Sequence, residues 1–411
     1  MTSLIPSAAN RSGNDPIFAL NAEAKRRAAA GEAIVNATLG ALMDDDGRLL
    51  LLPSVVEALR EVPAGKAAAY APIAGEPGFL RAVIGDVFGT GPLAAQTVAV
   101  ATPGGTGALY LAIADFLEPG QALLTTDFYW GPYHTLAVQS GRAVETFAMF
   151  GKGGGFDTAA MDAALQQQIE RQGRALIFLN SPCHNPTGYS LDDAEWQAVA
   201  ASVRRAGERA PVALLVDLAY ARFAATEVEW AQHLLPVLDT ATLLVAWSGS
   251  KSFAQYGARI GALIGVHRDL ESRQRLANAF AFGCRGTWSN CNHQGQLAVA
   301  ALLTDPAQRA RADADRARLI ALLHERVTVW NREAARAGLS YPRYEGGFFV
   351  TVFADDAEAA AARAREEGVF VVPVRGEGRG ALRVALCATP AAAVPRVVAT
   401  LQRAIGAVGR S

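Results

Sequence analysis

The sequence predicts an α/β protein with a doubly wound, mostly parallel sheet and a smaller α+β domain. From about residue 97 onward, short strand-like runs alternate with helical stretches, an order that places helices on both faces of a sheet. Several of these runs are apolar throughout, as strands are when both faces are covered. With 411 residues, 51% of them hydrophobic, the chain can form a large core and a second domain.

The expected elements follow in chain order. A polar, then alanine-rich N-terminal segment predicts an arm and a first helix around Asn21–Ala30. Strands are expected at Thr97–Ala101, Ala122–Thr126, Ala175–Asn180, Val212–Asp217, Leu243–Trp247 and Ala262–Val266, and helices at Ala108–Leu117 and Asp192–Arg209. A long helix from Asp305 to about Arg336 follows. The strand-like runs Phe348–Phe353, Val369–Val374 and Leu382–Cys387 then predict the smaller domain.

Composition excludes several classes of protein. The 38 basic and 39 acidic residues give a net charge of −1, which supplies neither a basic surface for nucleic acid nor a polyanionic tail. No run of about 18 uncharged apolar residues and no signal-peptide pattern is present, so we expect no membrane span. The four cysteines form no C-x-x-C pair and no metal-type cluster, which favours a cytoplasmic protein without a metal site.

The residues that follow each strand are the candidates for function, because ligands bind beyond the carboxyl ends of parallel strands. The first strand runs into T-P-G-G-T-G-A-L, residues 102–109. Its glycines let the backbone approach an anion, and the helix that starts there offers free N–H groups to a phosphate. An ordinary glycine turn before a helix has the same sequence. The spacing is not G-x-G-x-x-G, so no dinucleotide is implied, and we expect residues 376–380 (G-E-G-R-G) to be a loop.

Two further strands end in polar side chains. One leads into S-P-C-H-N-P-T-G, where a turn would present the amide of Asn185, and His184 beside it is expected to be structural. The next ends at Asp217, with Tyr220 three residues later. A carboxylate at the end of a buried strand needs a cation or a strong donor, and a protonated ring nitrogen would serve. A plain turn and a capping aspartate are the simpler interpretations of these two motifs.

A lysine follows the next strand, in S-G-S-K, with Arg259 eight residues after Lys251. Burial and neighbouring cations lower the pKa of an amine, which suits it to Schiff-base chemistry. Ser248 and Arg259 could hold a dianionic phosphate beside it, whereas a solvated surface lysine is the plain alternative. An anion cradle, an amide, a carboxylate with a phenol, and a lysine at successive strand ends together match the functional groups of pyridoxal phosphate.

These motifs extend from about Asn36 to Arg383, and in them the sequence resembles the fold-type I, class I aminotransferases, in particular the aspartate and aromatic amino acid branch. S-x-S-K with an arginine eight residues later is the most specific of them. The resemblance implies a large cofactor-binding domain with a seven-stranded sheet at 51–312 and a small domain at 313–411, with residues 1–50 as an arm and part of the small domain. It also implies a homodimer with active sites at the subunit interface.

The same resemblance implies pyridoxal phosphate as cofactor and a role for each matching residue. Lys251 forms the internal aldimine, Asp217 pairs with the ring nitrogen, and Asn185 and Tyr220 hydrogen-bond the ring oxygen O3′. Trp130 stacks on the ring, as its flat apolar surface allows. The residues implied around the phosphate are Gly105, Thr106, Ser248, Ser250 and Arg259, with Tyr70 reaching it from the neighbouring subunit.

Substrate contacts follow from the resemblance in the same way. Arg383, on the apolar run A-L-R-V-A-L, binds the α-carboxylate, which a bidentate guanidinium suits. Arg285 binds the distal carboxylate of a dicarboxylic substrate across the dimer, with a surface or interface position as the alternative. Gly40 covers the substrate, and Asn185 and Trp130 also contact it. The chain departs from this branch at Tyr133, where a histidine usually stands three residues after the stacking tryptophan.

The expected activity is transamination between an L-amino acid (aspartate, glutamate or an aromatic one) and a 2-oxo acid such as 2-oxoglutarate. A C–S β-lyase of the same fold is a rival, because the cofactor contacts alone do not choose the fate of the substrate carbanion. A catalytically idle regulatory module is a third hypothesis, although no helix-turn-helix segment of useful length precedes the expected fold.

Overall fold

A seven-stranded sheet is the largest feature of the computed structural model, which describes residues 2–11, 13, 15–225 and 229–408. The strand order is β2-β8-β7-β6-β5-β3-β4, and β8 alone runs antiparallel to its neighbours. The strands are β2 (Thr97–Pro103), β3 (Ala122–Thr126), β4 (Ala143–Phe147), β5 (Ala175–Asn180), β6 (Val212–Asp217), β7 (Thr242–Ser248) and β8 (Ile260–Val266). The predicted α/β class with a mostly parallel sheet is confirmed.

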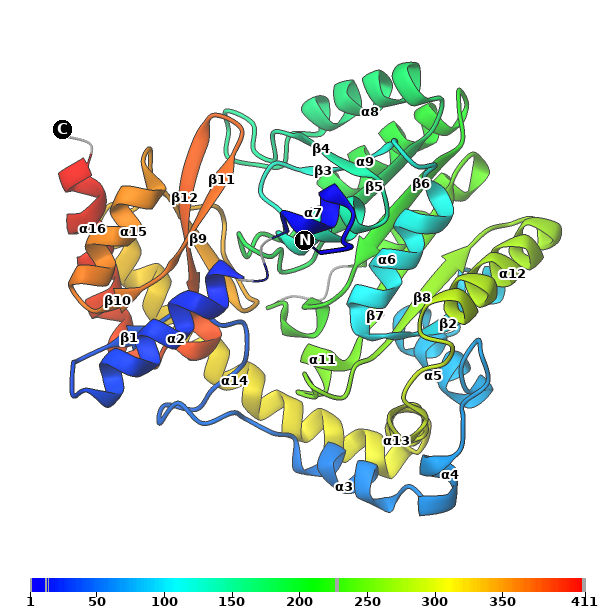
Figure 1. Cartoon of the computed structure of the whole chain (residues 1–411), viewed down its shortest axis with the longest axis horizontal. Helices are drawn as coiled ribbons and strands as arrows, with labels where there is room; N and C mark the ends of the chain where they lie inside the picture. Colours follow the sequence, from blue (N-terminus) through cyan, green and yellow to red (C-terminus); the bar gives the residue numbers. More distant parts are fainter. Residues whose placement is uncertain (1, 12, 14, 226–228, 409–411) are drawn as a thin grey trace.

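Helices cover both faces of this sheet (Figure 1). Side chains alternate along β5, so Phe178 packs in one apolar cluster with Ile113 of α6 (Gly104–Phe116). Ile177, its neighbour in sequence, packs in the other cluster with Trp196 of α9 (Asp193–Gly207). Both faces of the inner strands are therefore buried, which explains their uninterrupted apolar sequences.

A smaller lobe lies beside the sheet, at the left of Figure 1. It contains a three-stranded antiparallel sheet in the order β11-β12-β9 and a two-stranded parallel pair of β1 with β10. Its strands are β1 (Val35–Asn36), β9 (Phe349–Phe353), β10 (Val369–Phe370), β11 (Val372–Gly376) and β12 (Arg379–Ala385). Because β1 pairs with β10, residues near the start of the chain form part of this lobe.

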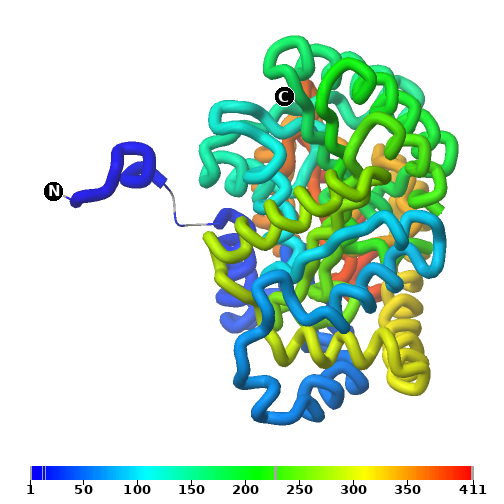
Figure 2. Tube along the Cα trace, turned by 90° about the vertical axis from the view of Figure 1, so that its right-hand side faces the viewer, coloured from blue at the N-terminus to red at the C-terminus, as the bar shows by residue number. Residues whose placement is uncertain are grey.

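The remaining helices pack around these two bodies, and α14 (Pro306–Arg336) runs beneath both of them in Figure 1. Figure 2 shows α1 extending away from the body of the molecule. No helix among the described residues is long and apolar enough to cross a bilayer. The other α-helices are α1 (Pro6–Ala9), α2 (Pro16–Ala29), α3 (Pro53–Glu61), α4 (Ala64–Ala68), α5 (Pro77–Phe88), α7 (Pro132–Gln139), α8 (Thr158–Gln172), α10 (Trp230–His233), α11 (Gly249–Ser252), α12 (Leu270–Thr287), α13 (His293–Thr304), α15 (Ala357–Glu366) and α16 (Val394–Val408).

The structure corrects the sequence prediction in three places. Strand β4 was missed, because at the sheet edge it is mostly half-buried and carries Glu145 beside valine and threonine. The run Val369–Val374 divides into two strands, β10 and β11, which join different sheets. The expected loop at 376–380 is the tip of the β11–β12 hairpin, whose first and last residues belong to the strands.

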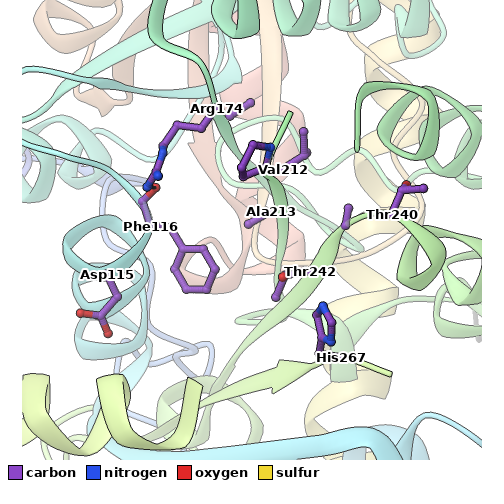
Figure 3. Close-up of a pocket in the computed structure, with 11 residues that line it drawn as sticks. Asp115, Phe116, Arg174, Val212, Ala213, Thr240, Thr242 and His267 are labelled. Atoms are coloured by element: carbon purple, nitrogen blue, oxygen red, sulfur yellow. Dashed lines mark hydrogen bonds between the residues drawn. The ribbon is translucent and has the colours of Figure 1, made fainter. Parts of the chain in front are cut away.

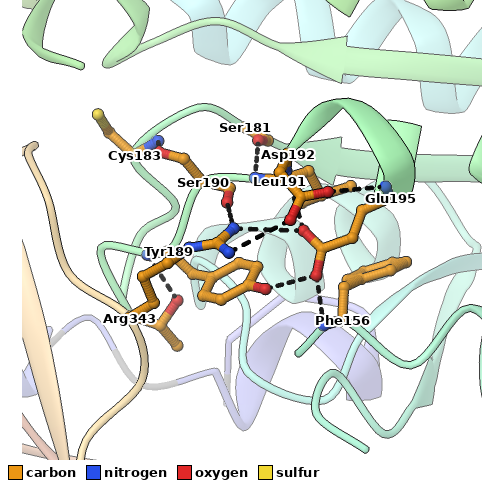
Figure 4. A network of polar contacts seen from close by, with 10 residues as sticks. Phe156, Ser181, Cys183, Tyr189, Ser190, Leu191, Asp192, Glu195 and Arg343 are labelled. Carbon is orange, nitrogen blue, oxygen red and sulfur yellow. Dashed lines mark hydrogen bonds and ion pairs between the residues drawn. The ribbon is translucent and has the colours of Figure 1, made fainter. Parts of the chain in front are cut away.

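A polar network joins the smaller lobe to the main sheet (Figure 4). Arg343 precedes β9 and donates hydrogen bonds to the Ser190 carbonyl (2.7 Å) and to Asp192 Oδ2 (3.3 Å). Glu195, in the first turn of α9, accepts from Arg343 and from the Tyr189 hydroxyl (2.5 Å). These contacts fix the loop after β5 against the smaller lobe.

Gly188 in that loop allows a second close contact between the two bodies. Its φ is +73°, and a Cβ there would lie 2.2 Å from the Phe349 carbonyl oxygen and 2.4 Å from the Tyr344 ring.

We therefore expect Gly188→Ala to lower the free energy of unfolding by about 2 kcal/mol or more, measured by urea denaturation. Gly153→Ala, where a Cβ meets nothing within 4 Å, is the matched control. Equal stability of the two variants would contradict this assignment.

Candidate active site

A cavity of about 530 Å³ lies at the carboxyl ends of β5, β6 and β7, bounded by the smaller lobe. The structure brings together there all of the site residues expected from within one chain. Those that line the cavity are Gly40, Gly105, Thr106, Trp130, Asn185, Asp217, Tyr220, Ser248, Ser250, Lys251, Arg259 and Arg383.

The expected anion cradle is formed where β2 passes into α6. Gly104 has a φ of +72°, and a Cβ at that position would lie 2.5 Å from Nη2 of Arg259. The Arg259 guanidinium is therefore packed against the turn, where it also donates to the Ser250 hydroxyl at 3.2 Å. Ser248 caps α11 by accepting from the Ser250 N–H. A guanidinium, hydroxyls and the free N–H groups of a helix start suit a dianionic phosphate.

Lys251 lies in α11, and its side chain enters the cavity. Its Nζ donates to the Gly40 carbonyl at 2.7 Å and lies 4.4 Å from the centre of the Tyr256 ring. Burial lowers the pKa of this amine to about 8, and the positive charges of Arg259 and Arg383 act in the same direction. A larger fraction of the amine is therefore uncharged and nucleophilic near neutral pH than in an ordinary lysine.

Asp217 is the buried acid of the site, only 5% exposed. Its Oδ2 accepts from the Tyr133 hydroxyl at 2.8 Å, and its Oδ1 accepts from the Ala219 N–H at 3.0 Å. Burial raises the pKa of this carboxyl to about 6, although both hydrogen bonds favour the ionised form. No cationic side chain among the described residues forms an ion pair with it, so a positively charged ring nitrogen would suit this position.

Asn185 and Tyr220 lie side by side next to the carboxylate. The Asn185 amide donates to the Tyr220 hydroxyl at 3.2 Å, and both side chains are buried. Asn180, which we did not predict as a site residue, holds this pair in place. Its amide donates to the Asp217 backbone carbonyl, and its oxygen accepts from the Asn185 N–H at 2.7 Å. Its position at the end of β5 was the signal that could have identified it.

Arg383 reaches the cavity from β12 of the smaller lobe. Its Nη2 donates to the Thr38 carbonyl at 2.6 Å, and its Nη1 lies 3.4 Å from Asn185 Oδ1. The guanidinium lies over the Phe349 ring, and its buried Nε–H has no partner among the described residues. A nearly buried guanidinium that forms no ion pair among the described residues is a site for a carboxylate.

Tyr70 and Arg285 do not join the cavity of a single chain. Tyr70 is 89% exposed just after α4, and Arg285 in α12 donates to the Ser289 hydroxyl. Sequence reasoning missed other residues that do line the cavity. Asp15 caps α2 just before Pro16, a recognisable helix-start signature, and this places Ile17 and Phe18 at the cavity.

A second cavity, of about 280 Å³, lies at the amino ends of β5, β6 and β7 (Figure 3). It contains Asp115, Arg174 and His267. The Arg174 guanidinium already has a partner there, because it donates a hydrogen bond to the Phe116 carbonyl in the last turn of α6. Ligands of such sheets bind at the opposite edge. No group of three or more possible metal ligands is present among the residues that the structure describes.

Comparison with known proteins gives consistent results. The family model "Aminotransferase class I and II" matches residues 33–401. A tyrosine aminotransferase of Klebsiella pneumoniae is 30% identical over 386 residues, which are 90% of this chain and 93% of the relative. Other relatives are named aromatic-amino-acid and aspartate aminotransferases.

Solved structures show the same similarity. An aminotransferase from Anaerococcus prevotii has a TM-score of 0.90 and 31% identity, with 98% of this chain and 100% of that chain covered. An aromatic-amino-acid aminotransferase from Burkholderia pseudomallei, covalently bound to pyridoxal phosphate, has a TM-score of 0.81 and 26% identity, with 98% and 100% covered.

Because burial lowers the pKa of Lys251, its reactivity should depend on pH differently from that of an exposed lysine. In the cofactor-free protein, we expect the rate of reductive methylation at Lys251 to rise with a midpoint near pH 8, since the neutral amine is the reactive form. Peptide mapping distinguishes it from the exposed Lys25, Lys66 and Lys152. A midpoint near the pKa of an ordinary lysine, about 10.4, would contradict the effect of burial.

Proposed function

The chain belongs to the class I and II aminotransferases and is a pyridoxal-phosphate-dependent transferase, and from this premise we propose the donor and acceptor of its reaction. It moves an amino group between an L-amino acid (aspartate, glutamate or an aromatic one) and a 2-oxo acid, with 2-oxoglutarate as acceptor. The observation that carries the proposal is that Asp217, buried and without an ion pair among the described residues, shares one cavity with the amine of Lys251 and the guanidinium of Arg383.

We propose the following contacts with the cofactor. Gly105, Thr106, Ser248, Ser250 and Arg259 hold the phosphate, because a cradle of glycines, hydroxyls and one guanidinium surrounds the start of α6. Trp130 would cover the ring, and the amine of Lys251 would form the covalent link to the aldehyde carbon with loss of water. Asn185 and Tyr220 bind the ring oxygen. When bound, pyridoxal phosphate accepts the electron pair of the broken substrate Cα–H bond into its ring.

Lys251 and Asp217 perform the acid–base work. Once the substrate amine has replaced it on the cofactor, the amine of Lys251, uncharged above about pH 8, would be free to take the proton from the substrate Cα and to return it to the carbon that carried the aldehyde. Asp217 stays ionised beside a cation and thereby keeps the proton on the ring nitrogen. A fixed negative charge in a buried site stabilises developing charge without the cost of reorienting water.

Arg383 orients the substrate. Its free Nε–H and its Nη groups can bind the α-carboxylate in a bidentate pair, with Phe349 holding the guanidinium from one side. Gly40 allows the chain to pass close to Phe349, because a Cβ there would lie 2.6 Å from the Phe349 ring. A substrate bound there would lie in the same cavity as the amine of Lys251, which now donates to the Gly40 carbonyl.

The walls of the cavity support aromatic as well as acidic substrates. Ile17, Phe18, Leu39 and Leu109 line it with apolar surface that can pack against a ring. A dicarboxylic substrate needs a second cation, and we propose that Arg285 of a partner subunit supplies it. Tyr70 and Phe282, at 89% and 82% exposed, lie open for such a homodimer.

We propose residues 51–312 as the cofactor-binding domain, and residues 313–411 with part of 1–50 as the small domain.

An amino-exchange assay tests this proposal. The holoenzyme is incubated with 2-oxoglutarate and either aspartate or phenylalanine, and glutamate formation is followed. We expect glutamate from both donors, with a lower KM for the donor that the side-chain pocket fits better. Release of pyruvate and ammonia from a cysteine conjugate without glutamate formation would instead show a β-lyase, and absence of both reactions would refute the proposed activity.

Removal of the buried charge should slow the reaction more than it weakens cofactor binding. We expect Asp217→Ala to lower kcat about 10²- to 10³-fold at saturating pyridoxal phosphate, because the ring nitrogen then loses the charge that keeps it protonated. Asp217→Asn, which keeps the size and one acceptor but no charge, should lose a similar factor. Full kcat in either variant would contradict the role assigned to Asp217.

A further inference from the structure

The proposed mechanism gives no role to Tyr133, whose hydroxyl hydrogen-bonds the Asp217 carboxylate. Tyr133 lies in the first turn of α7, only 1% exposed, and its hydroxyl donates to Asp217 Oδ2 at 2.8 Å. The other oxygen of the carboxylate accepts from a backbone N–H, that of Ala219. Tyr133 is therefore the only side chain among the described residues that bonds the Asp217 carboxylate.

Aromatic packing fixes the direction of the Tyr133 hydroxyl. The ring packs edge-on against Trp130, with centroids 5.9 Å apart at 90°, and against Phe178 at 5.3 Å and 85°. Tyr129 is stacked on it at 6.2 Å and 14°. A ring held on three sides has little rotational freedom, so its hydroxyl remains directed at the carboxylate.

The groups that face this hydrogen bond stay uncharged over the neutral pH range. Burial and the nearby negative charge of Asp217 raise the pKa of Tyr133 well above 10. Burial likewise raises the pKa of Tyr220 and of Tyr129, the other phenols nearby. His184, in the loop after β5, has its pKa lowered to about 3 by burial and is neutral.

We propose that Tyr133 is a positioning residue that orients Asp217 toward the ring nitrogen of the cofactor and keeps this orientation unchanged from about pH 6 to pH 9. The proposal rests on the cofactor role of Asp217 in the proposed function. An imidazole at this position would behave differently, because it titrates near pH 6.5 and would change its charge within the working range. A phenol donates the same hydrogen bond but carries no charge at either end of that range.

Two variants and one control test this proposal. Wild type, Tyr133→Phe, Tyr133→His and the control Tyr129→Phe are prepared without cofactor, and their folding is checked by circular dichroism. The dissociation constant for pyridoxal phosphate is then measured, and the absorbance of the bound cofactor is recorded from pH 5.5 to pH 9.5. Neither measurement requires amino transfer.

We expect Tyr133→Phe to raise the dissociation constant at least tenfold, the typical effect of losing a hydrogen bond to a buried charge. Tyr133→His should restore affinity at low pH and add a second ionisation between pH 6 and pH 8 to the absorbance curve. Wild type and Tyr129→Phe should each fit a single ionisation. A merely structural role for Tyr133 would lower stability without adding this ionisation.

Unchanged affinity in Tyr133→Phe together with an unchanged absorbance curve in Tyr133→His would overturn the proposal. If Tyr133→Phe does not fold, Tyr133→His alone decides, since a single ionisation in that variant is the contradicting result. A result that overturns the role of Tyr133 can be distinguished from failure of the proposed function. A wild-type protein that binds pyridoxal phosphate but transfers no amino group refutes the substrates and leaves the absorbance comparison intact.

Discussion

Asp217 carries a carboxylate into the interior of the protein at the end of β6, where desolvation opposes its charge and raises its pKa to about 6. A buried charge without a partner is costly, and two hydrogen-bond donors offset only part of that cost. The arrangement is stable and useful when a cation occupies the cavity beside it. The other features of the site, from the amine of Lys251 to the cradle at the start of α6, surround the space that such a cation would fill.

The parallel sheet is what brings these groups together. The parallel strands β5, β6 and β7 end at the same edge, so Asn180, Asp217 and Ser248, each the last residue of its strand, converge although they are far apart in sequence. The smaller lobe completes the cavity by adding Arg383 from β12. Its position is fixed by contacts with the loop after β5, among them the bond from the Thr351 hydroxyl to the Pro186 carbonyl at 2.7 Å.

Sequence reasoning predicted the inner strands well, because burial on both faces makes them continuously apolar. It missed β4, since an edge strand that is partly exposed loses that signal, and it could not give the antiparallel direction of β8, because hydrophobic pattern does not encode strand direction. The residues at strand ends were predictable from motif and position. The contacts of Tyr256 were not, although it lies between Lys251 and Arg259, because the spacing of that motif reveals neither the bond from the Leu42 N–H to its hydroxyl nor its contact with Lys251.

The account depends on covalent attachment of pyridoxal phosphate at one amine, and this can be tested directly. The holoenzyme is reduced with borohydride, digested and mapped by mass spectrometry. We predict a single pyridoxyl group on the peptide that contains Lys251, because its amine is buried beside the cradle while Lys25, Lys66 and Lys152 are exposed. A pyridoxyl group on one of those three lysines, or on none, would contradict the account.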